Sequence, residues 1–140
     1  KRFNYASECQ KVLTEGTILG WANSLMTFSY SFIDDFLRQS SSKPPFPIPK
    51  LRFVQGAIAY ALKPVEGSGH APPTSHRAVY LLEELIPPGK PFIKYIHNSD
   101  ATPLQDEGED GYDVGVFLCF LQHLQYSHTH GLAYLSDFQG

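Results

Sequence analysis

The last four residues of the chain, Asp137, Phe138, Gln139 and Gly140, place a carboxylate and an amide two positions apart. Because side chains alternate across an extended strand, Asp137 and Gln139 are expected to face the same way, with Phe138 on the opposite face. Gly140 then allows the chain to turn away. Such a pair offers oxygen atoms to a metal ion or to a hydroxyl group. The alternative is an ordinary strand that ends in an acidic turn.

The segments before these residues are predicted to position them. Residues 132–136 (LAYLS) are an apolar run after the turn-like triplet 129–131, which predicts a buried strand leaving a tight turn. Farther upstream, apolar residues recur at helical spacing and predict an amphipathic helix that carries His123. They are Val114, Phe117, Leu118, Leu121 and Leu124. The acidic stretch 106–110 ahead of this helix is expected to be solvated.

The first part of the chain predicts a long amphipathic helix, or two, over residues 7–37, because apolar residues fall mostly three or four positions apart. Ser7 and Gln10 resemble a capping box at its start. Gly16 and Gly20 weaken its middle, since each glycine costs roughly 1 kcal/mol relative to alanine, and a bend fits there. The proline-rich stretch 40–49 then ends the helix and predicts a surface connection.

Two further segments predict strands. Residues 51–62 alternate loosely and are rich in branched and aromatic side chains, whereas residues 78–82 (AVYLL) are a continuous apolar run typical of the middle of a sheet. Residues 63–77 between them predict a loop, and residues 92–95 predict a short strand or turn. The order helix, strand, strand, helix, strand predicts an α+β domain rather than repeated βαβ units.

Composition limits the class of protein and its partners. The chain has 140 residues, of which 42% are hydrophobic and 18% charged, which predicts a soluble globular domain with a real core. Its net charge of −3, with lysine and arginine dispersed, predicts no nucleic-acid partner. No run approaches the roughly 18 apolar residues of a membrane span, and no signal region opens the chain, so no membrane partner is expected.

The cysteines indicate the compartment. Cys9 and Cys119 are the only two and lie far apart in the sequence, which argues against a disulfide scaffold. They favour a reducing compartment, with the cytoplasm as the default. Both ends are expected to be cut, because Lys1 lacks an initiator methionine and Gly140 stops just past a predicted strand. We therefore expect a fragment of a larger domain.

Three stretches, in order and spacing, resemble motifs of the alpha-kinases, a family of atypical protein kinases. Residues 82–87 (LEELIP) followed by 92–98 (FIKYIHN) are similar to the family's hinge strand and its downstream F-x-K-Y-x-x-N segment. Residues 120–126 (FLQHLQY) are similar to the A-F-S-H-F-T-Y helix, and residues 136–140 (SDFQG) to the D-[LI]-Q-G motif. The opening residues 1–3 (KRF) look like the end of the strand with the ATP-binding lysine. The resemblance covers nearly the whole chain and is closest to the expanded fungal members.

This resemblance implies a partial, two-lobed kinase-like domain. It would have a mostly antiparallel sheet, a long N-terminal helix and a second helix before the catalytic strand. Residues 1–85 would form the part of the N-lobe up to the hinge, and residues 86–140 the start of the C-lobe. The implied activity is transfer of the γ-phosphate of ATP, with Mg²⁺ as cofactor, to a serine or threonine of a protein substrate. The oligomeric state is not encoded in any feature of the sequence.

The resemblance also implies roles for single residues. Asp137 would orient the substrate hydroxyl and accept its proton, and Gln139 would help to hold Mg²⁺ through a hard oxygen ligand. His123 falls where the family places a zinc-binding histidine, whose cysteine partners would lie beyond Gly140. Zn²⁺ is thus expected only in an intact domain, although Cys119, one helical turn away, could form an accidental second ligand. The alternative for this histidine is an ordinary core or surface position.

The remaining implied roles concern ATP. Lys1 would pair with the α- and β-phosphates, Glu83 and Leu85 would meet the adenine at the hinge, and Asn98 matches the family asparagine. A solvated terminal lysine, a strand-ending carboxylate and a turn asparagine are the alternatives. The kinase hypothesis predicts that Lys1, Glu83, Asp137 and Gln139 line one cleft between the sheet and the helix that carries His123.

The sequence also departs from the family pattern. The phosphate-covering hairpin and the T-D-P segment with a second metal-binding aspartate have no counterpart in it. Departures from the helix motif include Leu121, Gln122, Leu124 and Gln125. The hinge is disturbed by Pro88 and Pro91. A pseudokinase-like binding module is therefore the first alternative function. An unrelated structural α+β domain is the second, and it predicts no such cleft.

Overall fold

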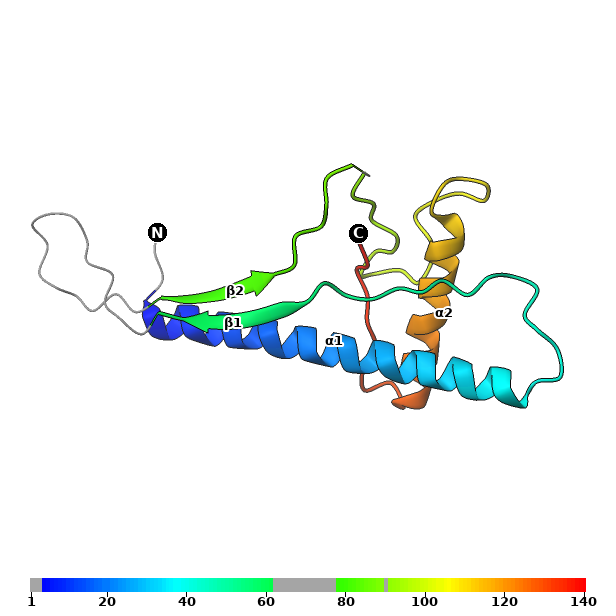
Figure 1. The fold of residues 1–140 in the computed structure, drawn as a ribbon, viewed down its shortest axis with the longest axis horizontal. Coiled ribbons are helices and arrows are strands. Elements are labelled where there is room, and N and C mark those ends of the chain that lie inside the picture. The colour runs from blue at the N-terminus through cyan, green and yellow to red at the C-terminus, as the bar shows by residue number, and fades with distance from the viewer. Residues whose placement is uncertain (1–3, 62–77, 90) are drawn as a thin grey trace, which may run out of the picture. The chain divides into compact units, whose positions relative to one another are not determined.

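The computed structural model describes residues 4–61, 78–89 and 91–140, so Lys1 and all of the predicted loop 63–77 lie outside the described residues. The described chain contains two helices and two strands in the order α1, β1, β2, α2 (Figure 1). Their bounds are Tyr5–Gln39, Gly56–Tyr60, Val79–Glu83 and Tyr112–His128. The predicted α+β class is confirmed.

The chain divides into two compact units, and each is described by itself. The first unit takes in residues 1–21 and 53–86, and the second takes in residues 22–52 and 87–140. The assignment of kinase lobes to residues 1–85 and 86–140 stays a prediction.

Helix α1 begins one residue after Asn4, whose side-chain oxygen accepts a hydrogen bond of 2.9 Å from the backbone N–H of Ser7. Asn4 is therefore the N-cap, and the predicted capping box at Ser7 is wrong, because Ser7 already lies in the first helical turn. The helix is assigned continuously through Gly16 and Gly20 as one element of 35 residues. It ends at Gln39, directly before the proline-rich stretch, as predicted.

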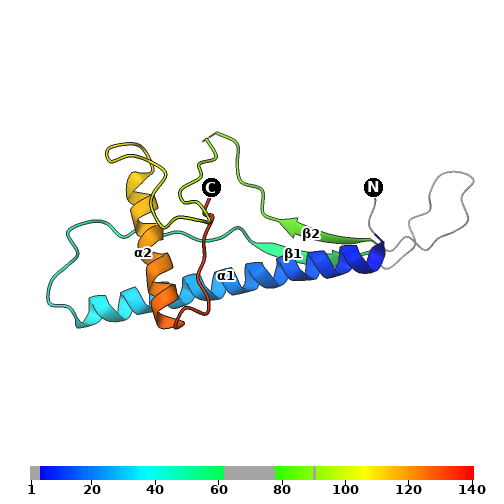
Figure 2. The same cartoon turned by 180° about the vertical axis from the view of Figure 1, so that it is seen from behind.

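In the first unit, β1 and β2 pair antiparallel, from Gly56 opposite Glu83 to Tyr60 opposite Val79. The strand pair runs alongside the N-terminal part of α1 in both views (Figures 1 and 2). A glycine permits this close approach, since a Cβ atom at Gly16 would lie only 2.6 Å from Ile58 Cδ1. The glycine that weakens the isolated helix thus serves the packing of the sheet against it.

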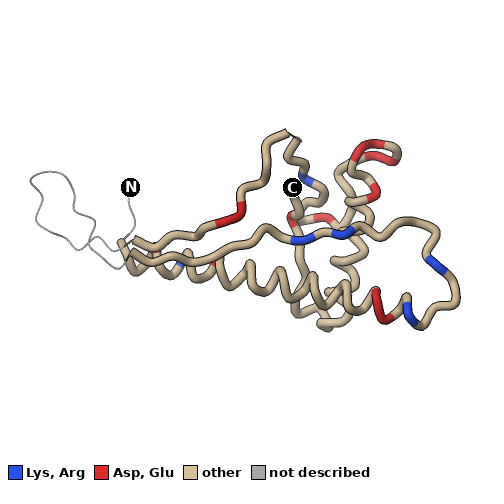
Figure 3. Tube along the Cα trace, in the orientation of Figure 1, with Lys and Arg blue, Asp and Glu red and all other residues tan. Residues whose placement is uncertain are grey.

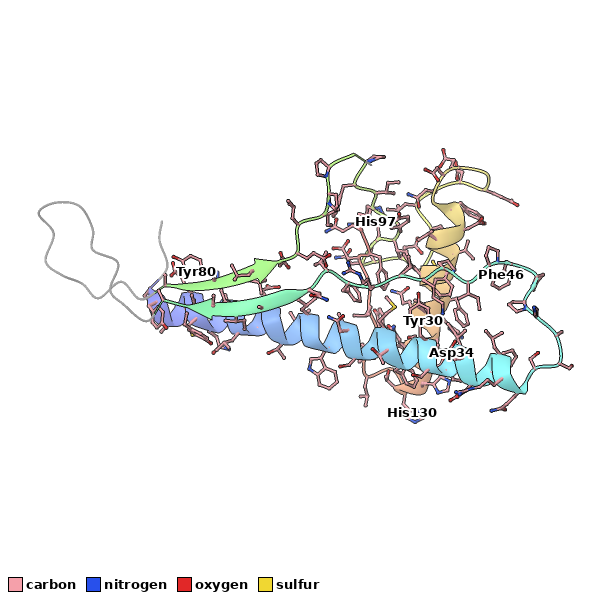
Figure 4. All side chains as sticks on the ribbon, viewed as in Figure 1. Tyr30, Asp34, Phe46, Tyr80, His97 and His130 are labelled. Carbon is pink, nitrogen blue, oxygen red and sulfur yellow. The ribbon has the colours of Figure 1, made fainter. Side chains whose placement is uncertain are left out.

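The sheet of the first unit is narrower than the sequence predicts. The apolar run of β2 predicts a strand in the middle of a sheet, but Tyr80 (labelled in Figure 4) is 51% exposed and Leu82 54% exposed. Only Val79 of this strand is buried. The expectation is wrong for the described residues, because their sheet has two strands and leaves one face of β2 open. The strand ends at Glu83, as predicted.

In the second unit, α2 crosses the C-terminal part of α1 (Figures 1 and 2). The predicted apolar face of α2 is confirmed, because four of its five residues are buried: Phe117, Leu118, Leu121 and Leu124. From α1, Met26 and Ile33 are buried as well. This helix pair forms the core of the unit.

Tyr30, labelled in Figure 4, ties the proline-rich connection to α1. Its hydroxyl donates to the carbonyl of Pro49 at 2.8 Å and accepts from the N–H of Leu51 at 2.8 Å. Its ring lies 6.2 Å from that of Phe117 in α2. The acidic stretch 106–110, the red loop just before α2 in Figure 3, is exposed throughout, as predicted.

The approach to Asp137 differs from the prediction. The turn at 129–131 is confirmed by the positive φ angles of His130 (55°) and Gly131 (79°). Residues 132–136, however, are not assigned as a strand, and Leu132 is 88% exposed. The predicted buried strand is therefore wrong. No helix within the described ranges, including α1, is long and apolar enough to cross a membrane.

Candidate functional site

The last three residues pair with the short segment 93–95. Ile93 and Gly140 exchange both backbone hydrogen bonds, at 2.7 and 2.9 Å, and the N–H of Tyr95 donates to the carbonyl of Phe138 at 2.9 Å. Between these bonds, Lys94 lies directly opposite Gln139. Side chains of directly opposed residues share one face of an antiparallel pair. The pairing therefore brings a lysine to the amide that the sequence singled out.

The segment 93–95 is also fixed by contacts with residues 103–105. Ile96, the next residue, is fully buried and forms a bridge with Pro103. The N–H of Leu104 donates to the carbonyl of Tyr95 at 2.9 Å, and the Gln105 amide donates to the carbonyl of Lys94 at 2.9 Å. The segment 93–95 is thus held both by the end of the chain and by the loop that precedes α2.

Asp137 has an unusual backbone conformation. Its φ angle is 61°, in the left-handed region that residues with a Cβ atom rarely adopt. The residue after it, Phe138, is 7% exposed and anchors the chain in the core, whereas Asp137 and Gln139 are exposed. The predicted division, with Asp137 and Gln139 on one side and Phe138 on the other, is confirmed. The departure from regular strand geometry was not predicted.

The carboxylate of Asp137 forms an ion pair with the ammonium group of Lys94. Both side chains remain accessible, at 47% and 39% exposure. The ion pair therefore sits at the surface, where a substrate could reach either charge. Asp137, Gln139 and Lys94 together form a small site with one carboxylate, one amide and one ammonium group, which we call the carboxylate site.

Lys94 is the member of the carboxylate site that sequence reasoning missed. Its position in the F-x-K-Y-x-x-N segment drew attention to the segment but supplied no role. The pairing with Gln139 joins residues that are far apart in sequence, so no local pattern reports it. A charged residue in an otherwise apolar short strand is the only signal that could have pointed to it.

The proposed hinge residues belong to the first unit. Glu83 ends β2 opposite Gly56, and the following N–H of Glu84 donates to the carbonyl of Gln55 at 2.8 Å. Leu85 is 83% exposed. Since Glu83 and Leu85 lie in one unit and Asp137 and Gln139 in the other, the shared cleft stays a prediction, and Lys1 lies outside the described residues.

Asn98 and His123 line one pocket of about 310 Å³ in the second unit, together with Cys119 and Asp100. The predicted proximity of Cys119 and His123 is confirmed by this shared lining. Burial, together with the negative charge of Asp100, raises the pKa of the Cys119 thiol above its usual value. A raised pKa disfavours the thiolate, which is the form of cysteine that binds metal ions.

The residues around His123 do not make a zinc site by themselves. Within the described part of the chain, no group of three or more histidine, cysteine, aspartate or glutamate residues is placed to hold a metal ion. A structural zinc site needs four such ligands in a tetrahedron. The zinc role of His123 thus stays a prediction that requires ligands from outside these residues.

A larger hollow in the second unit, of about 640 Å³, lies between α1, the proline-rich stretch and α2. Aromatic side chains such as Phe36, Phe46 (labelled in Figure 4) and Phe120 line it. Among its described lining residues, Asp113 is the one that carries a charge. An apolar hollow with a single carboxylate offers nothing to bind phosphate groups, so it does not compete with the carboxylate site.

Comparison with known proteins supplies the class. The sequence matches the alpha-kinase family over residues 20–140, which is most of the chain and includes the carboxylate site and α2. The chain therefore belongs to the alpha-kinase family, a family of protein kinases. No match is found among curated proteins or among solved structures.

Proposed function

We propose that this chain takes part in transferring the γ-phosphate of ATP to a serine or threonine hydroxyl of a protein substrate. The observation that carries the proposal is the exposed carboxylate of Asp137, held in a left-handed backbone conformation beside the ammonium group of Lys94. Strained backbone conformations outside glycine concentrate at functional sites, where the surrounding structure maintains them. Family membership supports the same reaction.

Phosphoryl transfer needs positioning and neutralisation of charge more than covalent chemistry from the protein. In our proposal, the Asp137 carboxylate orients the substrate hydroxyl and accepts its proton. Lys94 keeps that carboxylate in place through the ion pair. In our proposal, its positive charge would also attract phosphate oxygens of the bound nucleotide. Both groups are accessible, as this role requires.

Mg²⁺ fits the donor set of the carboxylate site. The carboxylate of Asp137 and the amide oxygen of Gln139 are hard oxygen ligands on accessible side chains. Gln139 would hold the ion, with phosphate oxygens and water completing its coordination. When bound, the ion would neutralise phosphate charge. Orientation of the substrate hydroxyl and acceptance of its proton would come from the Asp137 carboxylate rather than from the ion.

The remaining roles follow the family resemblance. Glu83 and the exposed Leu85 would meet the adenine of ATP, Lys1 would pair with its α- and β-phosphates, and Asn98 would contact the nucleotide. The chain would act on a protein substrate in the cytoplasm, with no nucleic-acid or membrane partner. We also propose that the chain belongs to the expanded fungal branch of the family.

The decisive experiment compares the intact protein with Asp137→Asn and Asp137→Ala variants. Transfer of labelled phosphate from ATP to serine-, threonine- and tyrosine-containing peptides is measured together with ATP binding. Loss of a positioned proton acceptor should lower turnover by at least about a hundredfold while ATP binding persists. Asp110→Asn, an exposed residue of the acidic stretch, is the matched control and should keep normal turnover.

Three results would contradict the proposal. Near-normal turnover in both Asp137 variants would mean that this residue is structural. An intact wild-type protein that binds ATP and transfers nothing would instead support the pseudokinase alternative. Failure to bind ATP at all would favour an unrelated structural role.

A further inference from the structure

The segment that leads to Asp137 is held by side chains from the end of α2 rather than by a sheet. The Thr129 hydroxyl donates to the carbonyl of Ala133 at 2.7 Å and accepts from the N–H of Ala133 at 3.0 Å. Two residues later, the N–H of Leu135 donates to the side-chain oxygen of Gln125 at 2.9 Å. Side chains thus replace the strand partner that the sequence predicted.

Gln125 connects three parts of the second unit. Its oxygen accepts from Leu135, and its NH₂ group donates to the hydroxyl of Ser29 in α1 at 3.0 Å. Ser29 in turn donates to the carbonyl of Leu25 at 2.7 Å. A backbone N–H can only donate, so the amide oxygen must face Leu135, which leaves the NH₂ group for Ser29. Gln125 and Ser29 are both fully buried.

This network ends two residues before Asp137. On the other side of Asp137, Phe138 is buried and its carbonyl accepts from the N–H of Tyr95 at 2.9 Å. The left-handed residue is therefore bracketed by Leu135 and Phe138, each fixed by a hydrogen bond to a different element. A left-handed residue with a side chain costs on the order of 1–3 kcal/mol and persists only where its surroundings over-determine it.

We propose that Gln125 is a positioning residue for Asp137. By holding Leu135 against α1 and α2, it keeps the Asp137 carboxylate beside Lys94 and in reach of the substrate hydroxyl. The proposal rests on the proposed function of Asp137 and extends it to a buried residue that touches neither substrate nor nucleotide. A displacement of about 1 Å at a reacting group can lower turnover by about a hundredfold.

The test is the Gln125→Met variant of the intact protein, which keeps the length of the side chain and removes both hydrogen bonds. Its kcat should fall at least about tenfold, whereas KM for ATP should change less than about twofold, because the nucleotide contacts are not altered. In an Asp137→Asn background, Gln125→Met should cause little further loss, since the carboxylate it positions is already gone.

Gln122→Met is the matched control. Gln122 is a buried glutamine three residues earlier on the same helix, and its side-chain oxygen has no hydrogen-bond partner among the described residues. Removing an unpaired buried acceptor is expected to be nearly neutral. Turnover of Gln122→Met should therefore stay within about twofold of wild type. Equal kcat values for the two methionine variants would overturn the proposal.

Hydrogen exchange makes the test independent of activity. Amides of residues 132–140 should exchange at least about tenfold faster in Gln125→Met than in Gln122→Met, while amides in the middle of α2 stay alike. Equal exchange in both variants would overturn the positioning role even if the wild-type protein transferred no phosphate. Absent transfer together with faster exchange would instead overturn only the proposed function.

If Gln125→Met does not fold, Gln125→Glu replaces it, because a carboxyl oxygen can still accept from the N–H of Leu135. Protection of residues 132–140 should then remain within about threefold of wild type, since the bond to Leu135 is the one that restrains the segment. Loss of that protection in a folded Gln125→Glu protein would count against the proposal.

Discussion

Asp137 combines a functional group with a backbone conformation that favours glycine. Its φ angle of 61° costs a residue with a Cβ atom roughly 1–2 kcal/mol. Aspartate tolerates this region better than most residues do, because its short polar side chain can bond locally. The ion pair with Lys94 is too exposed to offset much of that cost. The ion pair therefore does not explain, through stability, why this position carries a carboxylate.

A stability measurement can separate the effect of the Asp137 carboxylate from the effect of the backbone conformation at this position. The free energy of unfolding of Asp137→Gly should be about 1 kcal/mol larger than that of Asp137→Ala, since glycine adopts positive φ without strain. Both variants should be inactive in phosphate transfer. Denaturant unfolding of the two proteins checks the difference. Equal stability would mean that Asp137 is not left-handed in solution.

The glycines of α1 show how an element is shaped by its neighbour. Gly16 and Gly20 are equally unfavourable in an isolated helix. In the folded first unit they differ, because a Cβ atom at Gly16 would meet Ile58 Cδ1 at 2.6 Å, whereas one at Gly20 would meet nothing within 4 Å. A methyl group would therefore enter open space at Gly20, whereas at Gly16 it would require the end of the Ile58 side chain to move.

Alanine substitution tests this difference directly. Gly20→Ala should stabilise the protein by up to about 1 kcal/mol through helix propensity alone. Gly16→Ala should be about 1 kcal/mol less stable than Gly20→Ala, since the end of the Ile58 side chain must move to admit the methyl group and this strain offsets the gain in propensity. Thermal or denaturant unfolding of both variants measures it. A Gly16→Ala protein as stable as Gly20→Ala would show that β1 does not pack on this turn of α1.

At the scale of the whole molecule, the kinase hypothesis requires the hinge and the carboxylate site to grip one ATP molecule. These residues belong to different units of the described structure. With Mg²⁺ and ATP, amide exchange should therefore slow in both segments 83–86 and 137–140 of the intact protein. Exchange in the acidic stretch 106–110 should not change. Protection of one segment alone would contradict a shared cleft.

Metal content is the second test at this scale. The described residues gather no zinc site around His123, and the Cys119 thiol beside it has a raised pKa. The 140-residue chain, dialysed against a mild chelator, should therefore contain far less than one zinc per molecule by elemental analysis. Stoichiometric zinc that is lost in His123→Ala would show that this chain completes a site by itself.

The sequence by itself determined the elements whose cause is local. Helical spacing of apolar residues predicted both α1 and the buried face of α2, and the prolines after Gln39 predicted where α1 ends. The alternation around Phe138 predicted which side chains of the last segment face out. The order of the three motifs along the chain predicted the alpha-kinase family. Comparing motifs along a sequence does not require knowing which segments pair in the fold.

The tertiary structure alone decided how the carboxylate site is built. Residues 132–136 have strand-like composition, but Thr129 and Gln125 bind their backbone in place of a partner strand. Lys94 reaches Asp137 only because residues 93–95 pair with the end of the chain. The Thr129 contact spans four residues, but the others join segments separated by ten to more than forty residues, and local propensity carries no information about them.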